Sequence, residues 1–495
     1  MTLEKKVARL IYPEFRFGKM SLKDGLDLVK MGVGGFCLYG GSLNEVVETI
    51  RALRNASKTP LIFAADYENG VGQWIKEATM LPTNMAIGAS QRPEFARRKA
   101  EITAIESDAI GVDWIFAPVV DLSTNHSNPI VNLRAFSDSP SKVQEFASNY
   151  ISGLDSFNII SCLKHFPGHG DTSCDSHISL PEIKKTKDDL RNLELKPFKS
   201  LINKADSVMV GHLKINSLDE FNITSFSKNT ITDLLIKELG FNGVVITDAL
   251  SMKAISDESY AGVNAFLAGA HILLVPENPY KLYSALMQAI EEEKISENSI
   301  DKAISMQDLL IRKRAFSKKN TRDISIVGSS HHKNFNLQCA PYCITWIKGK
   351  KEGFFKDFKK VYYFEPLKTE ADLRGDHFIK FLKSRGINFT QNIDEAELII
   401  IGSFLEPKAY SGKINLDIEE KYEMEKILKY RKKYLLISFG SPFIFDEYYG
   451  KVDAGICAFG PIKEFQETLA RGLMGEINLS GTLPVELSIL KENAK

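Results

Sequence analysis

Short apolar runs alternate with longer amphipathic segments through about residue 315 of the chain. The apolar runs are typical of buried strands, and they cover residues 35–39, 61–66, 114–121, 158–163, 207–212, 243–248 and 271–275. Between them, segments such as 43–55, 94–110 and 141–152 repeat apolar residues at helical spacing. Continuous apolar strands that alternate with helices indicate a parallel sheet covered by helices on both faces.

Seven strand–helix units over this length favour a (β/α)8 TIM-type barrel over an open sheet. Several predicted strands end in titratable residues, namely Asp66, Asp121, Lys164 with His165, His212 and Asp248. A single aspartate in such a place is more often the N-cap of the next helix. In a barrel, however, the strand ends converge on one face, where active sites lie, whereas an open sheet spreads them along an edge. We therefore expect residues 1–316 to form a catalytic barrel.

A second α/β pattern follows a polar segment at residues 317–323, which we interpret as a linker. Its predicted strands cover residues 324–327, 361–364, 398–401, 435–438 and 454–457, with helical segments such as 420–430 between them. This alternation predicts an α/β/α sandwich domain over residues 324–495. It contains no obvious catalytic cluster, so we expect a structural role beside the site or in assembly.

The apolar run at 158–163 leads into a glycine-rich loop, Lys164 to His177, with the sequence KHFPGHGDTSCDSH. This loop could be a polar turn without a catalytic role. However, a surface loop has no packing reason to gather one lysine, three imidazoles and two carboxylates, so the composition favours a functional site. Asp175 lies two residues before His177, so its carboxylate can hold one ring nitrogen and raise the basicity of the other. Such a histidine can act as a general acid and then as a general base near neutral pH.

The residues themselves leave three reaction types open. Cys174 or Ser176 could be the nucleophile of an acyl hydrolase, although the chain has no Gly-x-Ser-x-Gly elbow. A metal hydrolase could use His165, His169, Asp171 and Asp248, but the helical His-x-x-x-His spacing of zinc enzymes is absent. Alternatively, Asp248 at a strand end could attack the anomeric carbon of a sugar.

Composition narrows the classes of partner. The 63 basic and 63 acidic residues cancel, which argues against nucleic acid or an anionic membrane as partner. Residues 1–7 lack the apolar core of a signal peptide, and no apolar stretch is long enough to span a bilayer, so we expect a cytoplasmic protein. The six scattered cysteines fit no common zinc pattern. We therefore expect neither a metal nor a cofactor.

The loop motif resembles family-three glycoside hydrolases, in particular their bacterial β-N-acetylglucosaminidases. Its pattern is lysine-histidine-x-proline-glycine-histidine-glycine, four residues, and then aspartate-serine-histidine, which is a highly specific signature. Segments 66–70, 116–121, 128–136, 243–252 and 475–485 also resemble stretches of this family, so the resemblance covers nearly the whole chain.

The resemblance implies roles for particular residues. Asp248 matches the catalytic nucleophile, His177 matches an unusual histidine acid/base, and Asp175 matches the carboxylate paired with it. The residues that match the hydroxyl-binding positions for the N-acetylglucosamine ring are Asp66, Arg134, Lys164 and His165. These roles imply a retaining hydrolase that removes terminal non-reducing N-acetylglucosamine from cell-wall (muropeptide) or chitin-derived saccharides.

Four positions depart from the family pattern: Asn69 for a glycine, Trp74 for an arginine, Ala249 for a second aspartate, and His271 for an aspartate. A β-glucosidase or a phosphorylase of the same fold is therefore the alternative, because a neutral acid/base does not repel an attacking phosphate. An inactive sugar-binding protein is the alternative that is not an enzyme. The expected partner is a small saccharide, and the expected assembly is a monomer or homodimer.

Overall fold

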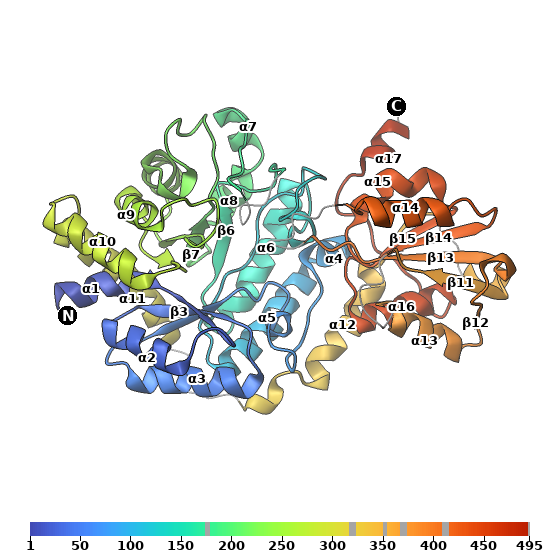
Figure 1. Cartoon of the computed structure of the whole chain (residues 1–495), viewed down its shortest axis with the longest axis horizontal. Coiled ribbons are helices and arrows are strands. Elements are labelled where there is room, and N and C mark those ends of the chain that lie inside the picture. Colours follow the sequence, from blue (N-terminus) through green and yellow to red (C-terminus); the bar gives the residue numbers. More distant parts are fainter. Residues whose placement is uncertain (174–178, 316–322, 350–353, 367–373, 408–414, 494–495) are drawn as a thin grey trace. The chain divides into compact units, whose positions relative to one another are not determined.

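The computed structural model describes residues 1–173, 179–315, 323–349, 354–366, 374–407 and 415–493 (Figure 1). These residues form two compact units. Unit 1 comprises Met1–Met80, Ala96–Leu122 and Pro140–Ser329, and unit 2 comprises Leu81–Phe95, Ser123–Ser139 and Ser330–Lys495. Two segments from the first half of the chain thus belong to unit 2, which a division along the sequence at 317–323 does not anticipate.

Unit 1 contains short, almost entirely buried strands. They are β1 (Ile11–Tyr12), β2 (Glu14–Arg16), β3 (Gly35–Tyr39), β4 (Ile62–Ala65), β5 (Trp114–Ile115), β6 (Cys162–Phe166), β7 (Ser207–Val210), β8 (Val244–Thr247) and β9 (Leu273–Leu274). Each of the seven predicted runs contains a strand, with bounds that shift by up to six residues. The predicted run at 114–121 shortens most, because Pro118 has no backbone N–H to donate to a sheet.

The pairing of these strands is parallel throughout. One sheet has the order β2-β3-β4-β5, a second has the order β6-β7-β8, and β1 pairs with β9. Isolated bridges join Trp114 to Ile160 and Ile246 to Ile272. The two N-terminal strands, which sequence reasoning missed, are too short to show a pattern and are separated only by Pro13.

Alternate residues of the strands share one apolar core. The members of this core include Ile62 and Ala64, Trp114 and Phe116, Ile160 and Cys162, Val244 and Ile246, and Ile272 and Leu274. Because side chains along a strand alternate between faces, each strand turns one face toward this common interior. A second core cluster packs helices near the N-terminus against helices that follow β8 and β9.

The helices of unit 1 begin at local capping signals. Ser21 and Asp24 form a capping box at the start of α2, and Ser42 and Glu45 form one at the start of α3. The helices in unit 1 are α1 (Leu3–Arg9), α2 (Leu22–Met31), α3 (Leu43–Ala56), α5 (Pro93–Ile110, from Ala96), α6 (Pro140–Asp155), α7 (Lys187–Asn192), α8 (Leu195–Leu201), the π-helix η4 (Asn229–Glu238), α9 (Glu258–Ala268), α10 (Pro279–Glu291) and α11 (Glu297–Ala315).

Unit 2 is built on a sheet with the order β10-β15-β14-β13-β11-β12. Its strands are β10 (Thr345–Lys348), β11 (Lys360–Phe364), β12 (Asn388–Phe389), β13 (Leu398–Ser403), β14 (Lys433–Ser438) and β15 (Ala454–Cys457). All pairs are parallel except the edge pair of β10 with β15. The longer helices of unit 2 are α12 (Ser330–Cys343), α13 (Asp376–Ser384), α14 (Ile418–Ile427) and α16 (Lys463–Leu473), with α4 (Asn84–Ala89), α15 (Phe445–Tyr448) and α17 (Ser488–Asn493) shorter.

One predicted strand is wrong. Residues Ile324–Ile326 form a short 3-10 helix whose first turn is capped by the Asp323 side chain, and they belong to unit 1. This apolar segment is too short for its pattern to distinguish a strand from a single helical turn.

Across the described residue ranges, no helix is long and apolar enough to cross a membrane.

Candidate active site

The sequence-predicted site residues fall into three groups. Asp66, Lys164, His165 and Asp248 lie in unit 1, at or just after the carboxyl ends of β4, β6 and β8. Arg134 lies in unit 2, at the end of the 3-10 helix η2 (Asn132–Arg134). Asp175 and His177 lie outside the residues that the structure describes.

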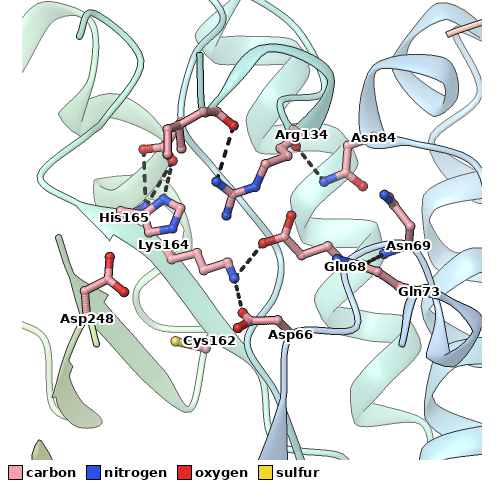
Figure 2. Close-up of polar contacts among 12 residues, drawn as sticks. Asp66, Glu68, Asn69, Gln73, Asn84, Arg134, Cys162, Lys164, His165 and Asp248 are labelled. Carbon is pink, nitrogen blue, oxygen red and sulfur yellow. Dashed lines mark hydrogen bonds and ion pairs between the residues drawn. The ribbon is translucent and has the colours of Figure 1, made fainter. Parts of the chain in front are cut away.

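A buried ammonium group on β6 contacts two carboxylates from the segment that follows β4. Lys164 Nζ lies 2.7 Å from Asp66 Oδ1 and 2.6 Å from Glu68 Oε1, and Figure 2 shows its side chain reaching between them. The side chains of Lys164 and Glu68 are only 2% and 5% exposed, whereas that of Asp66 is 27% exposed. Asp66 is therefore the member of this cluster that is open to a ligand.

Asp66 has further donors on its other side. The Tyr39 hydroxyl donates to Asp66 Oδ2 at 3.3 Å, and Trp74 Nε1 donates to the Asp66 backbone oxygen at 3.1 Å. Trp74, which departs from the family pattern, thus binds the backbone of a predicted substrate-binding residue. The other departure in this segment, Asn69, accepts a hydrogen bond from the buried Lys99 Nζ at 3.2 Å.

His165 is held by the buried carboxylate of Asp121, which lies in the segment after β5. Its Nδ1 lies 2.7 Å from Asp121 Oδ2, and its backbone N–H also donates to Asp121. The backbone N–H of His169 donates to Asp121 Oδ1 at 2.7 Å. Burial raises the pKa of Asp121, but neighbouring His165 and these donors hold it below its usual value. An ionised Asp121 fixes the orientation of the His165 ring.

His169 is buried in surroundings that disfavour its protonated form. Burial and nearby His165 together lower its pKa to about 4, although Asp121 and Asp248 oppose the shift. Its Nδ1 lies 2.9 Å from the Thr172 hydroxyl. His169 is therefore poorly suited to carry a proton, and its bond to Thr172 holds the loop locally. The following Asp171 pairs with Lys185 at 3.3 Å.

Asp248 lies directly after β8 and is partly exposed. Its Oδ1 accepts a hydrogen bond from the Ala249 N–H at 2.8 Å, and its own N–H donates to the Val210 oxygen at 3.0 Å. In Figure 2, its carboxylate points toward the side on which His165 and Lys164 lie. A carboxylate oriented by backbone donors at a strand end is suited to act on a bound substrate.

Two histidines, one at a predicted strand end and one at a departure from the family pattern, have structural roles. His212 lies close to the Ser225 hydroxyl at 2.7 Å and to the Ala249 oxygen at 3.0 Å, so it holds the backbone next to Asp248. His271 Nδ1 accepts a hydrogen bond from the Val245 N–H at 3.0 Å, and burial lowers its pKa to about 4. An aspartate at that position could also accept this bond, which explains why the departure is tolerated.

Arg134 is described within unit 2. Its backbone oxygen accepts a hydrogen bond from Asn84 Nδ2 at 2.8 Å, and its Nη1 donates to the Ile130 oxygen at 3.3 Å. The side chain of Asn128 accepts bonds from the N–H groups of Ile130 and Val131. The segment before Arg134 is therefore stabilised by local side-chain to backbone bonds.

Sequence reasoning missed three residues of this site as site residues: Tyr39, Glu68 and Asp121. Two of them carried a sequence signal for a place near the site. Asp121 ends an apolar run, and Glu68 follows Asp66 by two positions. Tyr39 carried none, since a tyrosine at a strand end is common. Within the described parts of the chain, no group of three or more His, Cys, Asp or Glu side chains could hold a metal ion.

Replacing Asp121 tests whether its carboxylate anchors His165. We expect Asp121→Asn to lower the free energy of unfolding by about 1–3 kcal/mol, because the carboxamide nitrogen would face N–H donors and leave a buried group unsatisfied. Urea-induced unfolding measures this change, with Asp188→Asn, at an 85% exposed side chain, as the control. Equal stability of the Asp121→Asn protein and the wild type would contradict the proposed anchoring.

Comparison with known proteins identifies the family. The model of the glycosyl hydrolase family 3 N-terminal domain matches residues 2–306. The chain belongs to glycosyl hydrolase family 3. The family recognised from the loop motif is therefore confirmed.

Relatives within this family bear hexosaminidase names. Beta-hexosaminidase A of Pseudoalteromonas piscicida is 30% identical over 355 residues, which cover 64% of this chain but only 59% of that relative. The beta-hexosaminidase of Idiomarina loihiensis is 34% identical over 268 residues, covering 52% of this chain and 80% of its own. This chain thus spans somewhat more than half the length of the first of these relatives.

Two solved structures share the fold over nearly the whole chain. A family 3 beta-N-acetylglucosaminidase from Paenibacillus sp. str. FPU-7 superimposes with a TM-score of 0.89 at 25% identity, covering 99% of both chains. A beta-glucoside phosphorylase, BglX, superimposes with a TM-score of 0.90 at 21% identity, covering 98% of this chain and 94% of its own. The second likeness shows the fold alone.

Proposed function

We propose that this protein is a retaining β-N-acetylglucosaminidase that removes terminal N-acetylglucosamine from cell-wall or chitin-derived saccharides. The observation that carries the proposal is the meeting of strand ends in unit 1. There, the Asp66–Lys164–Glu68 cluster and His165 supply hydroxyl-binding groups, and Asp248 supplies a carboxylate directly after β8. The hexosaminidase names of the relatives support N-acetylglucosamine as the sugar.

The proposed reaction proceeds in two displacements. First, Asp248 attacks the anomeric carbon, and the glycosidic bond breaks as His177 donates a proton to the leaving oxygen. Second, His177 removes a proton from water, which attacks the anomeric carbon and releases Asp248. Asp175 is proposed to hold the His177 ring through one nitrogen, as Asp121 holds His165. The two inversions together retain the β configuration.

We also propose that the strands of unit 1 form one closed barrel of eight strands. The support is the sequence of parallel pairs and bridges from β2 through β8 to β9 and β1, together with a core to which alternate residues of the strands contribute. The segment 11–16 would close it, because β1 pairs with β9 while β2 pairs with β3. Closure would bring Asp66 and Asp248 to the same end.

A labelling experiment tests the proposed function. A 2-deoxy-2-fluoro sugar is unsuitable because the acetamido group of N-acetylglucosamine occupies C2, so a 5-fluoro N-acetylglucosaminyl fluoride should be used to slow the second displacement. We expect mass spectrometry of the digested protein to place the trapped sugar on Asp248. Label on another carboxylate would reject Asp248 as nucleophile, and a product of inverted configuration would reject the retaining mechanism.

Substrate choice is tested with aryl glycosides. We expect aryl N-acetylglucosaminide to be cleaved faster than aryl glucoside, with release of free sugar whether or not phosphate is present. Faster cleavage of the glucoside would favour a β-glucosidase, and a sugar phosphate as the product would favour a phosphorylase. Binding of N-acetylglucosamine without any cleavage would favour a sugar-binding protein.

The acid role of His177 has its own test. We expect His177→Ala to slow the cleavage of N-acetylglucosaminides with poor leaving groups by about 10²- to 10⁴-fold, because proton donation contributes that much to such reactions. The first displacement of a dinitrophenyl N-acetylglucosaminide should change little, since its leaving group needs no proton. Pre-steady-state release of dinitrophenol measures this step, and an equal loss on both substrates would contradict the proposal.

A further inference from the structure

The carboxylate of Asp66 has one donor on each oxygen. Lys164 Nζ donates to Oδ1 at 2.7 Å, and the Tyr39 hydroxyl donates to Oδ2 at 3.3 Å. The last torsion of an aspartate side chain has a broad energy minimum, so donors on both oxygens restrict its rotation. Each carboxylate oxygen can accept about two hydrogen bonds, which leaves capacity on both oxygens for ligand hydroxyls.

Tyr39 is itself fixed by the adjacent strand. It lies opposite Arg16 in the parallel register of β2 and β3, and the guanidinium carbon of Arg16 lies 4.3 Å from the centre of its ring. Glu14 in turn holds Arg16, with its carboxylate 2.9 Å from Nη2. A guanidinium over a tyrosine ring is a favourable cation–π contact, so the ring position is well defined.

Trp74 supports the same arrangement from the segment after β4. Its ring meets that of Tyr39 edge to face, with 5.2 Å between ring centres and 76° between planes. Its Nε1 donates to the backbone oxygen of Asp66 at 3.1 Å. The two aromatic residues therefore contact each other, and each donates one hydrogen bond to Asp66.

We propose that Tyr39 and Trp74 are positioning residues that orient the Asp66 carboxylate toward the substrate hydroxyls. The proposal rests on the proposed function, in which Asp66 binds the sugar. Tyr39 fixes the side chain and Trp74 fixes the main chain, so that little conformational freedom is lost when a sugar binds. Groups held in place before binding increase affinity because less ordering is needed on binding.

The Tyr39 hydroxyl can be removed without removing the ring. We expect Tyr39→Phe to raise KM for aryl N-acetylglucosaminide about three- to tenfold, the loss typical of one hydrogen bond, and to leave kcat within about twofold. Tyr422→Phe, at a tyrosine of α14 that is 68% exposed, is the matched control and should change neither constant. Trp74→Phe keeps an aromatic ring but loses the Nε1 donor, and it should change KM in the same direction.

A double-mutant cycle separates positioning from general damage to the fold. If the hydroxyl acts through Asp66, adding Tyr39→Phe to an Asp66→Ala protein, which has no side-chain partner for the hydroxyl at position 66, should raise KM no further. The same fold-increase in both backgrounds would overturn the proposal, as would an unchanged KM in Tyr39→Phe alone. Rescue of KM is not expected from Tyr39→His, because the shorter ring cannot reach the same position.

Calorimetric titration with N-acetylglucosamine keeps this test independent of turnover. If the wild type binds the sugar without cleaving any glycoside, the proposed enzymatic function fails, and the cycle is then measured on Kd. Weaker binding by Tyr39→Phe that disappears in the Asp66→Ala background would still support positioning. If the wild type neither binds N-acetylglucosamine nor cleaves its glycosides, both proposals are overturned.

Discussion

Asp248→Ala should reduce kcat for aryl N-acetylglucosaminides by about 10⁴- to 10⁶-fold, the range seen when a covalent nucleophile is removed. The reason is that no other group would form the glycosyl-enzyme bond. The fold should be little affected, because the side chain is partly exposed at the end of β8 and is proposed to act on the substrate. Steady-state kinetics together with thermal unfolding measure both effects.

Chemical rescue makes this prediction specific. The cavity left by Asp248→Ala should admit azide, which can attack the anomeric carbon of an activated aryl glycoside in place of the carboxylate. A single displacement inverts the configuration, so the expected product is the α-glycosyl azide, identified by NMR. Asp188→Ala, at a side chain that is 85% exposed, is the matched control. Retention of most activity in Asp248→Ala, or loss of its folded state, would contradict the role as nucleophile.

The second large effect concerns stability. We expect Lys164→Met to lower the free energy of unfolding by about 3–5 kcal/mol, the typical cost of removing one partner from a buried ion pair. The buried ammonium contacts Asp66 at 2.7 Å and Glu68 at 2.6 Å, and its loss leaves both carboxylates without this cation. Chemical denaturation at pH 7 measures the change.

A second substitution can remove the charge of Glu68, one of the two carboxylates that contact Lys164. Lys164→Met with Glu68→Gln should be more stable than Lys164→Met alone, because the most buried carboxylate would no longer carry a charge. Lys302→Met, at an exposed lysine of α11, is the control and should stay within about 0.5 kcal/mol of the wild type. If the double variant is no more stable than Lys164→Met, the loss does not come from Glu68.

Local patterns were enough to predict most strands of both units. The run at 243–248 gave β8 with Asp248 directly behind it, and the run at 35–39 gave β3 with the same bounds. Prediction failed where the pattern was too short to have a period. Residues 324–326 form a 3-10 turn instead of a strand, and the two strands on either side of Pro13 were missed.

The chemical roles of strand-end residues were harder to predict. His212 and Asp121 both end apolar runs, yet His212 holds the backbone at Ala249, whereas Asp121 lies beneath a predicted sugar-binding residue. Sequence reasoning could not separate these cases, because the difference depends on which neighbouring strand each side chain faces.

The sequence by itself determined the family and the alternation of strands and helices, and it supplied the residues that we propose for glycosyl transfer, because these depend on local periodicity and on a long contiguous motif. Only the tertiary structure decided which of these residues act together. Lys164 meets Asp66 across 98 positions, and His165 meets Asp121 across 44. Such contacts depend on the order and register in which separate strands pair. The local sequence of either strand does not show this order, because the pairing is made by backbone hydrogen bonds that almost any residue can form.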